Sequence, residues 1–428
     1  MEKTIGVVGL WHLGCIIATS WSKLGNKVIG FDYDANRVAN LKSGKPPLYE
    51  PGLKESIDEN VTSNKLSFTN DIHELAQCDF IFLSYDTPVR EDDSTDATIL
   101  SDSVNDLKTI MKNGSILIVS SQTPAGFCRE LRSILQKENS SLDIAYSPEN
   151  LRLGEALECY MKPGRIILGT ADSNTELRCC ELFSKIDADL VCMNLESAEM
   201  VKHGINSFLA NSIVFANHLA EICESNGALI DDVVKGMKTD PRIGAKAYLA
   251  PGIGFSGGTL GRDLRVLQSV NDANAGFAKL FGLIHQLNGE RKIAIVQRTK
   301  KMLGSLKEKK IAILGVTYKP STSTLRRSLP LEIVDLLLAD DAMVNVFDPK
   351  ADFSELVGKP KFNVCLTVTD ALTKADIAIL LTEWKEFKTI DWDKEKTVMS
   401  QATIFDTKNF LDGNHLKAIG YKYYSVGR

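Results

Sequence analysis

The sequence predicts an α/β protein with two Rossmann-like, doubly wound parallel-sheet domains joined by a central helical domain. Three observations lead to this prediction. Short apolar segments alternate with helical patterns in the first half, a helical stretch without clear strands begins near residue 197, and the alternation restarts at residue 309. Strands that alternate with helices indicate a parallel sheet covered on both faces. We expect the domains at residues 1–195, 196–303 and 304–428.

The first domain opens with a βαβ unit. TIGVVGL (4–10) is a short apolar strand, a glycine-containing turn occupies 11–14, and a helical pattern covers 15–24. KVIGFDYD (27–34) then forms a second strand, which completes the unit. Further apolar runs at 79–84, 115–120 and 165–169 continue the sheet.

The middle and last regions differ in pattern. Residues 197–224 predict one long helix and residues 263–302 a further helical stretch, a type of spacer that often carries a dimer interface. The last domain has a predicted helix at 329–339. Its predicted strands are KKIAILGVTY (309–318), MVNVFDP (343–349), DIAILLT (376–382) and ATIFDT (402–407).

Composition excludes several classes of function. The 428 residues are 44% hydrophobic and 25% charged, with a net charge of -5 and scattered lysines and arginines, so we expect no nucleic-acid partner. No apolar run reaches membrane length and the first residues do not resemble a signal peptide, so we expect a cytoplasmic protein without membrane association. The nine cysteines form no CxxC pair and no histidines have ligand spacing, which predicts no metal site.

The first turn predicts a dinucleotide site. Gly9 and Gly14 match the outer glycines of G-x-G-x-x-G, while Trp11 replaces the middle glycine, which lets the backbone approach the pyrophosphate. The indole either fills the phosphate position or forces the loop onto another route. Asp32, at the end of the second strand, would bind the adenosine ribose hydroxyls and favours NAD. The alternative is a Rossmann shell that has lost its cofactor.

Many segments together resemble the UDP-glucose/GDP-mannose dehydrogenase family, and the similarity extends from Gly6 to about Gly413. Their order and spacing make the resemblance specific. The matching segments are GVVGLWHLG (6–14), PLYEPGL (47–53), DTP (86–88), SPENLRLGEA (147–156), KPGRIILG (162–169), AEMVKHGINSFLANSIVFANHLAEICE (198–224), DPRIG (240–244), PGIGFSGGTLGRD (251–263), GVTYKPSTSTLRRS (315–328), FDP (347–349), LTEW (381–384) and FDTKN (405–409).

The resemblance implies an N-terminal NAD domain and a C-terminal nucleotide-sugar domain that flank a helical dimer core. The family oxidises the C6 alcohol of a sugar to a carboxylate in two hydride transfers, using two NAD, for polysaccharide or glycoconjugate precursors. Between the two transfers a cysteine thiolate captures the aldehyde as a thiohemiacetal. Oxidation of the thiohemiacetal gives a thioester, which water hydrolyses.

The catalytic positions of the family are only partly retained. Thr259 replaces the cysteine, and an alcohol needs a strong adjacent base to attack because its pKa lies far above the thiol's value of about 8.5. Lys202 and Asn206, four residues apart on the long helix, match residues that stabilise an oxyanion, and Asp263 matches the proton-transfer aspartate. Glu149 matches the first family glutamate, but Leu153 replaces the second.

Further positions are expected to bind the two ligands. The cofactor positions are Gly9, Trp11, His12, Leu13, Gly14, Asp32, Thr87, Pro88, Gln122 in the Ser121–Pro124 loop, and Arg326. The substrate positions are Leu151, Arg242, Tyr248, Gly254 and Lys319, and Arg242 is expected to reach the substrate of a partner subunit. Basic groups among them suit a diphosphate through charge-assisted hydrogen bonds.

Three hypotheses remain open at the level of sequence. The first is an NAD-dependent dehydrogenase of a nucleotide sugar, whose reaction either continues to the acid or stops after one hydride transfer at an aldehyde or ketone. The second is an epimerase-type enzyme that oxidises transiently with bound NAD, and the third is a non-catalytic nucleotide-sugar-binding protein. The spacing after Tyr248 is closer to the GDP-mannose branch, whereas the UDP branch is broader, so the nucleobase stays open.

Overall fold

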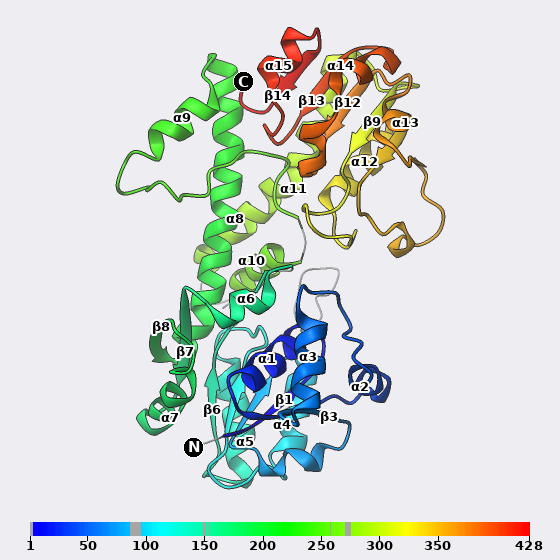
Figure 1. Ribbon diagram of the computed structural model, residues 1–428. Coiled ribbons are helices and arrows are strands. Elements are labelled where there is room, and N and C mark those ends of the chain that lie inside the picture. Colours follow the sequence, from blue (N-terminus) through cyan, green and yellow to red (C-terminus); the bar gives the residue numbers. More distant parts are fainter. Residues whose placement is uncertain (1–2, 86–95, 149–150, 153, 257, 270–274) are drawn as a thin grey trace. The chain divides into compact units, whose positions relative to one another are not determined.

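The computed structural model describes residues 3–85, 96–148, 151–152, 154–256, 258–269 and 275–428. The chain forms two compact units, Met1–Gly204 and Ile205–Arg428, and each unit contains one sheet (Figure 1). The predicted α/β class with two Rossmann-like sheets and a helical region is confirmed.

The sheet of the first unit has eight strands in the order β3-β2-β1-β4-β5-β6-β7-β8. Their bounds are β1 Thr4–Val8, β2 Lys27–Phe31, β3 Leu66–Thr69, β4 Phe80–Leu83, β5 Ile116–Val119, β6 Asp143–Tyr146, β7 Arg165–Thr170 and β8 Asp189–Asn194. The first six strands follow the Rossmann order, in which β1 and β4 flank the topological switch point. The sheet is not wholly parallel as predicted, because β7 pairs antiparallel to β6, with Ala145 opposite Thr170.

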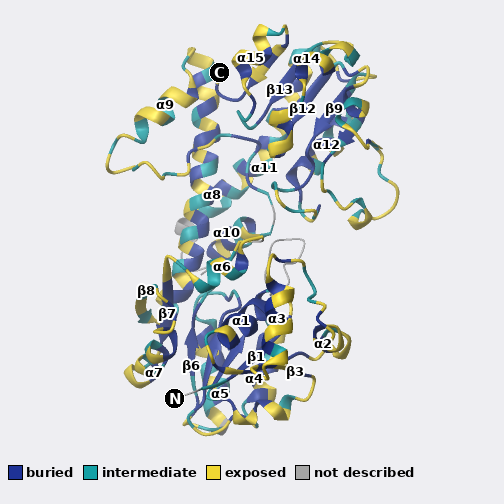
Figure 2. Cartoon of the chain, viewed as in Figure 1, coloured by how far each residue is buried: buried dark blue, intermediate teal, exposed yellow. Residues whose placement is uncertain are grey.

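Helices cover both faces of this sheet, and the buried strands appear as dark blue arrows between them (Figure 2). Trp21 of α1 packs with Phe82 on one face, while Tyr146 and Leu131 of α5 pack on the other. Continuous burial of this kind explains why the strands read as apolar runs. The helices are α1 His12–Lys23, α2 Ala35–Lys42, α3 Leu53–Thr62, the 3-10 helix η1 Ile72–Gln77, α4 Thr98–Leu107, α5 Phe127–Glu138, α6 Ala156–Met161, α7 Ser173–Phe183 and the start of α8 Leu195–Asn226, which continues into the second unit from Ile205.

The second unit repeats the Rossmann order in a six-stranded, wholly parallel sheet, β11-β10-β9-β12-β13-β14. Its strands are β9 Lys310–Leu314, β10 Met343–Phe347, β11 Asn363–Val364, β12 Ile377–Leu380, β13 Thr403–Asp406 and β14 Lys422–Ser425. Its helices are α9 Ile230–Met237, α10 Thr259–Ser269, α11 Ala275–Leu303, α12 Leu329–Ala339, α13 Val368–Leu372, α14 Trp392–Glu395 and α15 Gly413–Ala418, with the 3-10 helices η3 Phe353–Glu355, η4 Lys385–Thr389 and η5 Lys396–Val398.

Two helical predictions need correction. The first helix begins at His12, three residues before the predicted start, because the turn after β1 leads directly into it. The single stretch predicted at 263–302 is two helices, α10 and α11, and residues 270–274 between them lie outside the described residues. The predicted helix at 329–339 is confirmed as α12.

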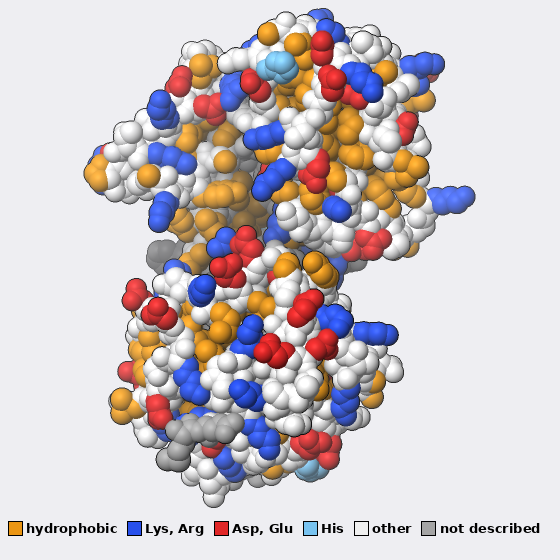
Figure 3. Space-filling view, in the orientation of Figure 1, with side chains coloured by type: hydrophobic (Ala, Val, Ile, Leu, Met, Phe, Trp, Pro, Cys, Tyr) orange, Lys and Arg blue, Asp and Glu red, His pale blue; other side chains and the backbone are white. Residues whose placement is uncertain are grey.

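Charged side chains of both signs are distributed over the surface. On the face that Figure 3 shows, the lysine and arginine side chains are interspersed with aspartate and glutamate. Among the described residues, no helix is both long and apolar enough to cross a membrane.

Candidate functional site

The turn after β1 has the geometry of a dinucleotide loop. Gly9 adopts a φ of +92°, which favours glycine, and its N–H donates to the Phe31 carbonyl at 3.0 Å. A Cβ on Gly14 would lie 1.8 Å from the Gly9 carbonyl oxygen. Both glycines are therefore required by the close approach of strand and helix.

Trp11 lies at the N-cap of α1 with its indole 41% exposed. The guanidinium carbon of Arg37 lies 5.4 Å from the centre of the indole ring, within the range of a cation–π contact. Helix α1 has no side-chain cap and no acidic residue in its first turn, which includes His12 and Leu13. Because the first N–H groups of a helix lack intrahelical partners and attract anions, this turn suits a pyrophosphate.

Asp32 follows β2 directly and is 2% exposed. Its carboxylate accepts hydrogen bonds from the N–H groups of Leu10 at 2.7 Å and Asp34 at 2.9 Å. Arg37 Nη1 donates to the same carboxylate at 2.8 Å. An acid at this place binds the ribose hydroxyls of NAD, so the residues present fit the cofactor. Sequence reasoning missed Arg37, although a basic residue five positions after the acid was visible.

The loop Ser121–Pro124, which contains the predicted cofactor residue Gln122, is held by helix α8. Glu199 is fully buried and accepts hydrogen bonds from Thr123 Oγ1 at 3.2 Å and from the N–H groups of Gly126 at 2.6 Å and Cys128 at 2.8 Å. His203 Nε2 lies 2.9 Å from the Thr123 carbonyl oxygen, to which it donates. Sequence reasoning missed Glu199, which immediately follows Ala198 in the matched segment. Gln122 is half-buried in this loop.

Two predicted catalytic residues meet in the second unit. The Asn206 side-chain amide of α8 donates to the carboxylate of Asp263 on α10, and both side chains are buried. Thr259 begins α10, four residues before Asp263, and is exposed. The sequence has no cysteine between Cys223 and Cys365, so no thiol replaces the missing nucleophile from this segment. Lys202, also on α8, is 8% exposed.

Gly254 allows the backbone conformation of the segment that precedes α10. It adopts a φ of +108°, and a Cβ there would lie 2.6 Å from Asn288 Oδ1. The Asn288 amide accepts from the Phe255 N–H at 2.8 Å and donates to the Phe255 carbonyl at 3.0 Å. Asn288 of α11, another residue that sequence reasoning missed, therefore holds the segment in place.

The other predicted ligand contacts of the second unit lie at the surface. Arg242 is exposed, and Asp240 accepts two hydrogen bonds from its guanidinium, at 3.0 and 2.7 Å. Tyr248 is 53% exposed, and partial burial with the nearby Glu383 charge raises the pKa of its hydroxyl. Lys319 Nζ lies 5.7 Å from the Tyr318 ring. Arg326 is exposed, and its N–H donates to Thr324 Oγ1 at 3.2 Å.

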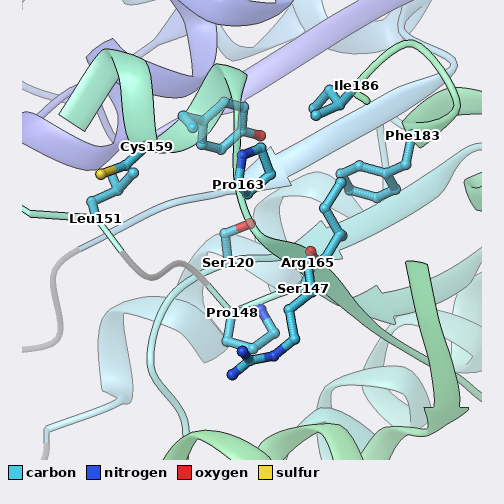
Figure 4. A pocket seen from close by; sticks show the side chains of 11 residues that line it. Ser120, Ser147, Pro148, Leu151, Cys159, Pro163, Arg165, Phe183 and Ile186 are labelled. Carbon is cyan, nitrogen blue, oxygen red and sulfur yellow. The ribbon is translucent and has the colours of Figure 1, made fainter. Parts of the chain in front are cut away.

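Leu151 lines a cavity of about 60 Å³ in the first unit (Figure 4). Nucleotide-sized ligands need cavities of roughly 300 Å³ or more, so this space does not hold the substrate by itself. Side chains of Ser120, Ser147, Tyr160 and Arg165 also line it. Three predicted site residues, Thr87, Pro88 and Glu149, lie outside the described residues.

Metal binding has no support in the part of the chain that the structure describes. There, no group of three or more histidine, cysteine, aspartate or glutamate side chains is arranged to hold a metal ion. All nine cysteines are free thiols.

Comparison with known proteins agrees with this arrangement. Residues 3–187 match the NAD binding domain of the UDP-glucose/GDP-mannose dehydrogenase family, residues 196–290 its central domain, and residues 312–413 its UDP binding domain. The match to the first of these domains confirms NAD as the expected cofactor.

Curated and solved relatives cover the chain almost completely. UDP-glucose 6-dehydrogenase TuaD of Bacillus subtilis is 32% identical over 100% of this chain and 93% of the relative. UDP-glucose 6-dehydrogenase of Rickettsia felis is 31% identical over 99% of this chain and 96% of the relative. The structure of a UDP-glucose dehydrogenase from Pyrobaculum islandicum superposes with a TM-score of 0.88 at 26% identity, covering 100% of this chain and 98% of that chain. The chain therefore belongs to the UDP-glucose/GDP-mannose dehydrogenase family.

Proposed function

We propose that this protein is an NAD-dependent oxidoreductase that oxidises a CH–OH group of a nucleotide sugar, with UDP-glucose as the first substrate to test. We further propose that the reaction stops at the aldehyde after one hydride transfer. Curated relatives named UDP-glucose 6-dehydrogenase support the substrate class. The match of residues 312–413 to a UDP binding domain favours a UDP sugar over a GDP sugar.

The buried pair of Asn206 and Asp263 is the observation that carries the proposal. A carboxylate that is fully buried is costly unless it is hydrogen-bonded, and Asn206 supplies a donor. Asp263 lies four residues after Thr259 on the same helix α10, so both side chains are on the same helix face. The pair therefore supports a chain that retains the groups for alcohol oxidation, although Thr259 replaces the nucleophilic cysteine.

Each retained residue has a role in the first oxidation. NAD, held by the first turn of α1 and by Asp32, would supply the acceptor for the hydride of the sugar carbon. The Asp263 carboxylate takes the proton of the hydroxyl oxygen, directly or through water, and the Asn206 amide keeps that carboxylate in position. The Lys202 ammonium stabilises the negative charge that develops on the same oxygen. Loss of hydride and proton leaves an aldehyde.

The second oxidation requires a group that adds to this aldehyde. The Thr259 hydroxyl is a poor substitute for a thiolate, because its pKa lies far above the cysteine value of about 8.5. The leucine at position 153, where the family has its second glutamate, also weakens hydrolysis of an acyl intermediate. The aldehyde is therefore the expected product.

The stoichiometry of NADH tests this proposal. The full-length protein is incubated with limiting UDP-glucose and excess NAD, and NADH is measured together with an aldehyde trap and mass spectrometry of the sugar nucleotide. One NADH per sugar with a trapped aldehyde supports the proposal. Two NADH per sugar with a uronic acid overturns the single oxidation.

Two other outcomes would favour the alternatives. Binding of NAD and UDP-sugars without NADH formation, over a panel of nucleotide sugars, would identify a non-catalytic binding protein. Deuterium exchange from solvent into the sugar without net NADH would identify an epimerase. The variant Thr259→Cys provides a matched gain-of-function test, since a restored thiol should raise the yield of NADH above one per sugar.

We also propose that the chain has three domains, residues 1–195, 196–303 and 304–428, and that it forms a homodimer in the cytoplasm. An exposed apolar stripe on α8 supports self-association. Phe208, Phe215 and Ile222 are 69%, 47% and 58% exposed and are spaced by seven residues, which places them on one helix face. A second copy of the chain is the occupant that we propose, because a helix face can pair with the same face of its copy.

A further inference from the structure

Glu50, in the segment PLYEPGL, connects two parts of the first unit that the function needs. Its side chain is 1% exposed, and its carboxylate binds three groups among the residues that the structure describes. His12 Nε2 lies 3.0 Å from Oε2, the Gly154 N–H donates to Oε2 at 3.1 Å, and the Ala156 N–H donates to Oε1 at 2.8 Å. These donors are 38 to 106 residues away in sequence.

The chemistry of the carboxylate fixes the direction of the His12 contact. An ionised carboxylate only accepts hydrogen bonds, so His12 Nε2 carries the hydrogen and donates. A buried carboxylate that loses a donor is strongly disfavoured, so the three donors stay together. Movement of the His12 ring therefore moves the Glu50 carboxylate, to which the Gly154 and Ala156 N–H groups donate.

The two connected parts carry different ligands in the proposed function. His12 is the first residue of α1, whose exposed N–H groups suit the cofactor pyrophosphate. Gly154 and Ala156 close the segment SPENLRLGEA, which contains Leu151, a proposed substrate contact. Ala156 also begins α6. One carboxylate thus joins the first turn of the cofactor helix to the end of the substrate segment.

We propose that Glu50 and His12 are positioning residues that couple cofactor binding to substrate binding within one chain. A pyrophosphate at the first turn of α1 restrains His12, which holds Glu50, which in turn holds the backbone at Gly154 and Ala156. By reciprocity, a substrate that binds beside Leu151 and holds the backbone at Gly154 and Ala156 increases the affinity of the cofactor turn by the same factor. The coupling rests on the proposed function, since it requires that both ligands bind.

NADH and UDP-glucose test the coupling, because both are reduced and no hydride transfer between them occurs. NADH fluorescence titrations of the full chain give its Kd without and with saturating UDP-glucose. We expect UDP-glucose to lower the wild-type Kd by about fivefold or more. His12→Phe keeps a ring without a donor and should reduce this fold change in the NADH Kd to about one. Glu50→Gln should have the same effect, because its amide hydrogens would face a backbone N–H that also donates.

Two further variants separate positioning from general damage. His12→Gln keeps an amide donor and should restore part of the factor. Asp172→Asn alters a carboxylate that caps α7 in the same unit, through the Asn174 and Thr175 N–H groups, and should leave the factor at the wild-type value. Hydrogen exchange of the peptide that contains Gly154 and Ala156 gives a second readout, with NADH-dependent protection in the wild type and in Asp172→Asn but not in His12→Phe.

Each result decides the proposal. The coupling is overturned if UDP-glucose lowers the NADH Kd by the same factor in the wild type and in His12→Phe, or if it does not change the wild-type Kd. In either case, NADH binding and turnover would leave the proposed function intact. A wild type that binds no NADH overturns the proposed function and the coupling together. Loss of the factor in His12→Phe and Glu50→Gln, with partial rescue by His12→Gln, supports the coupling.

Discussion

Arg37 and Asp32 form an ion pair beside the cofactor turn, with Arg37 Nη1 2.8 Å from Asp32 Oδ2. The same guanidinium lies against the Trp11 indole and reaches Asp34 at 3.7 Å. The pair gives the buried Asp32 carboxylate a cationic partner within the same chain. It also surrounds the one arginine with two acids, an arrangement that disfavours the 2′-phosphate of NADP.

Arg37→Ala is expected to lower the free energy of unfolding by about 1 kcal/mol. A hydrogen bond to a charged group contributes about 1.5–3 kcal/mol, and partial exposure of Arg37 reduces that contribution. Urea unfolding measures the difference. Lys54→Ala, which breaks the exposed pair with Asp58 on α3, serves as the control and should leave the free energy of unfolding close to the wild-type value. An equal effect of both variants would contradict the role of the Asp32 pair.

Trp11→Gly is expected to change the Kd for NAD by less than about tenfold. The turn already has the glycine geometry at Gly9 and Gly14, and the indole lies towards Arg37 in a contact that contributes about 0.5–1 kcal/mol. Calorimetry of both proteins measures the affinities. If the wild type does not bind and the glycine variant does, the indole closes the site and the protein is a binder of other ligands.

Asp263→Asn is expected to lower kcat for NADH formation by a factor of about 10² to 10⁴, because it removes the proposed proton acceptor. The KM for UDP-glucose should change much less. Steady-state kinetics separate the two parameters. Asp340→Asn, at an exposed ion pair with Lys300, is the matched control in the same unit and should keep wild-type kinetics. A preserved kcat in Asp263→Asn would exclude Asp263 as the acceptor.

Acid sensitivity of the first unit should depend on Asp172. Its hydrogen bond with Asp143 lowers the pKa of Asp172 to about 2, and the Thr175 and Asn174 N–H groups add to this effect against desolvation. Because the folded pKa lies below the ordinary value of 3.8, this group stabilises the fold above about pH 4. That contribution is lost as the pH falls from about 4 to 2.

Unfolding measured by circular dichroism across this pH window tests the assignment. Asp172→Asn should be less stable than the wild type at neutral pH, and the difference should shrink towards pH 2. A difference that is constant with pH would show that the carboxylate charge is not responsible.

Phe215→Glu is expected to convert a dimer into a monomer, because it places a charge at the centre of the apolar stripe on α8. Light scattering after gel filtration measures the mass of each protein. Leu177→Glu changes a single apolar residue on α7 that is 70% exposed, and should leave the oligomeric state unchanged. A wild type that is monomeric at all concentrations would contradict the dimer.

The central strands could be predicted from the sequence because both their faces are buried. β1, β4 and β5 are buried over most of their length and form continuous apolar runs. In contrast, β8 is largely exposed and β11 has only two residues, so neither produces such a run. The reversal of β7 was also missed, since apolar runs carry no information on strand direction.

The candidate site, too, could be predicted only in part from the sequence. Gly9, Gly14 and Asp32 belong to one βαβ motif, and the structure brings the Asp32 carboxylate to the turn after β1, where it accepts from the Leu10 N–H. Glu50 and Glu199 were missed because their partners lie far away in the sequence. Their function as buried acceptors depends on three-dimensional contacts, which a motif cannot record.

The contact between His12 and Glu50 also constrains how this chain can change over evolutionary time. Whenever position 50 carries a carboxylate in this environment, position 12 must supply a donor, since an apolar side chain there would leave the charge short of partners. Substitutions at the two positions are therefore expected to be correlated among descendants of this sequence. The side chain at position 12, the first residue of the cofactor helix, is thus constrained by Glu50, which lies 38 residues away in the sequence.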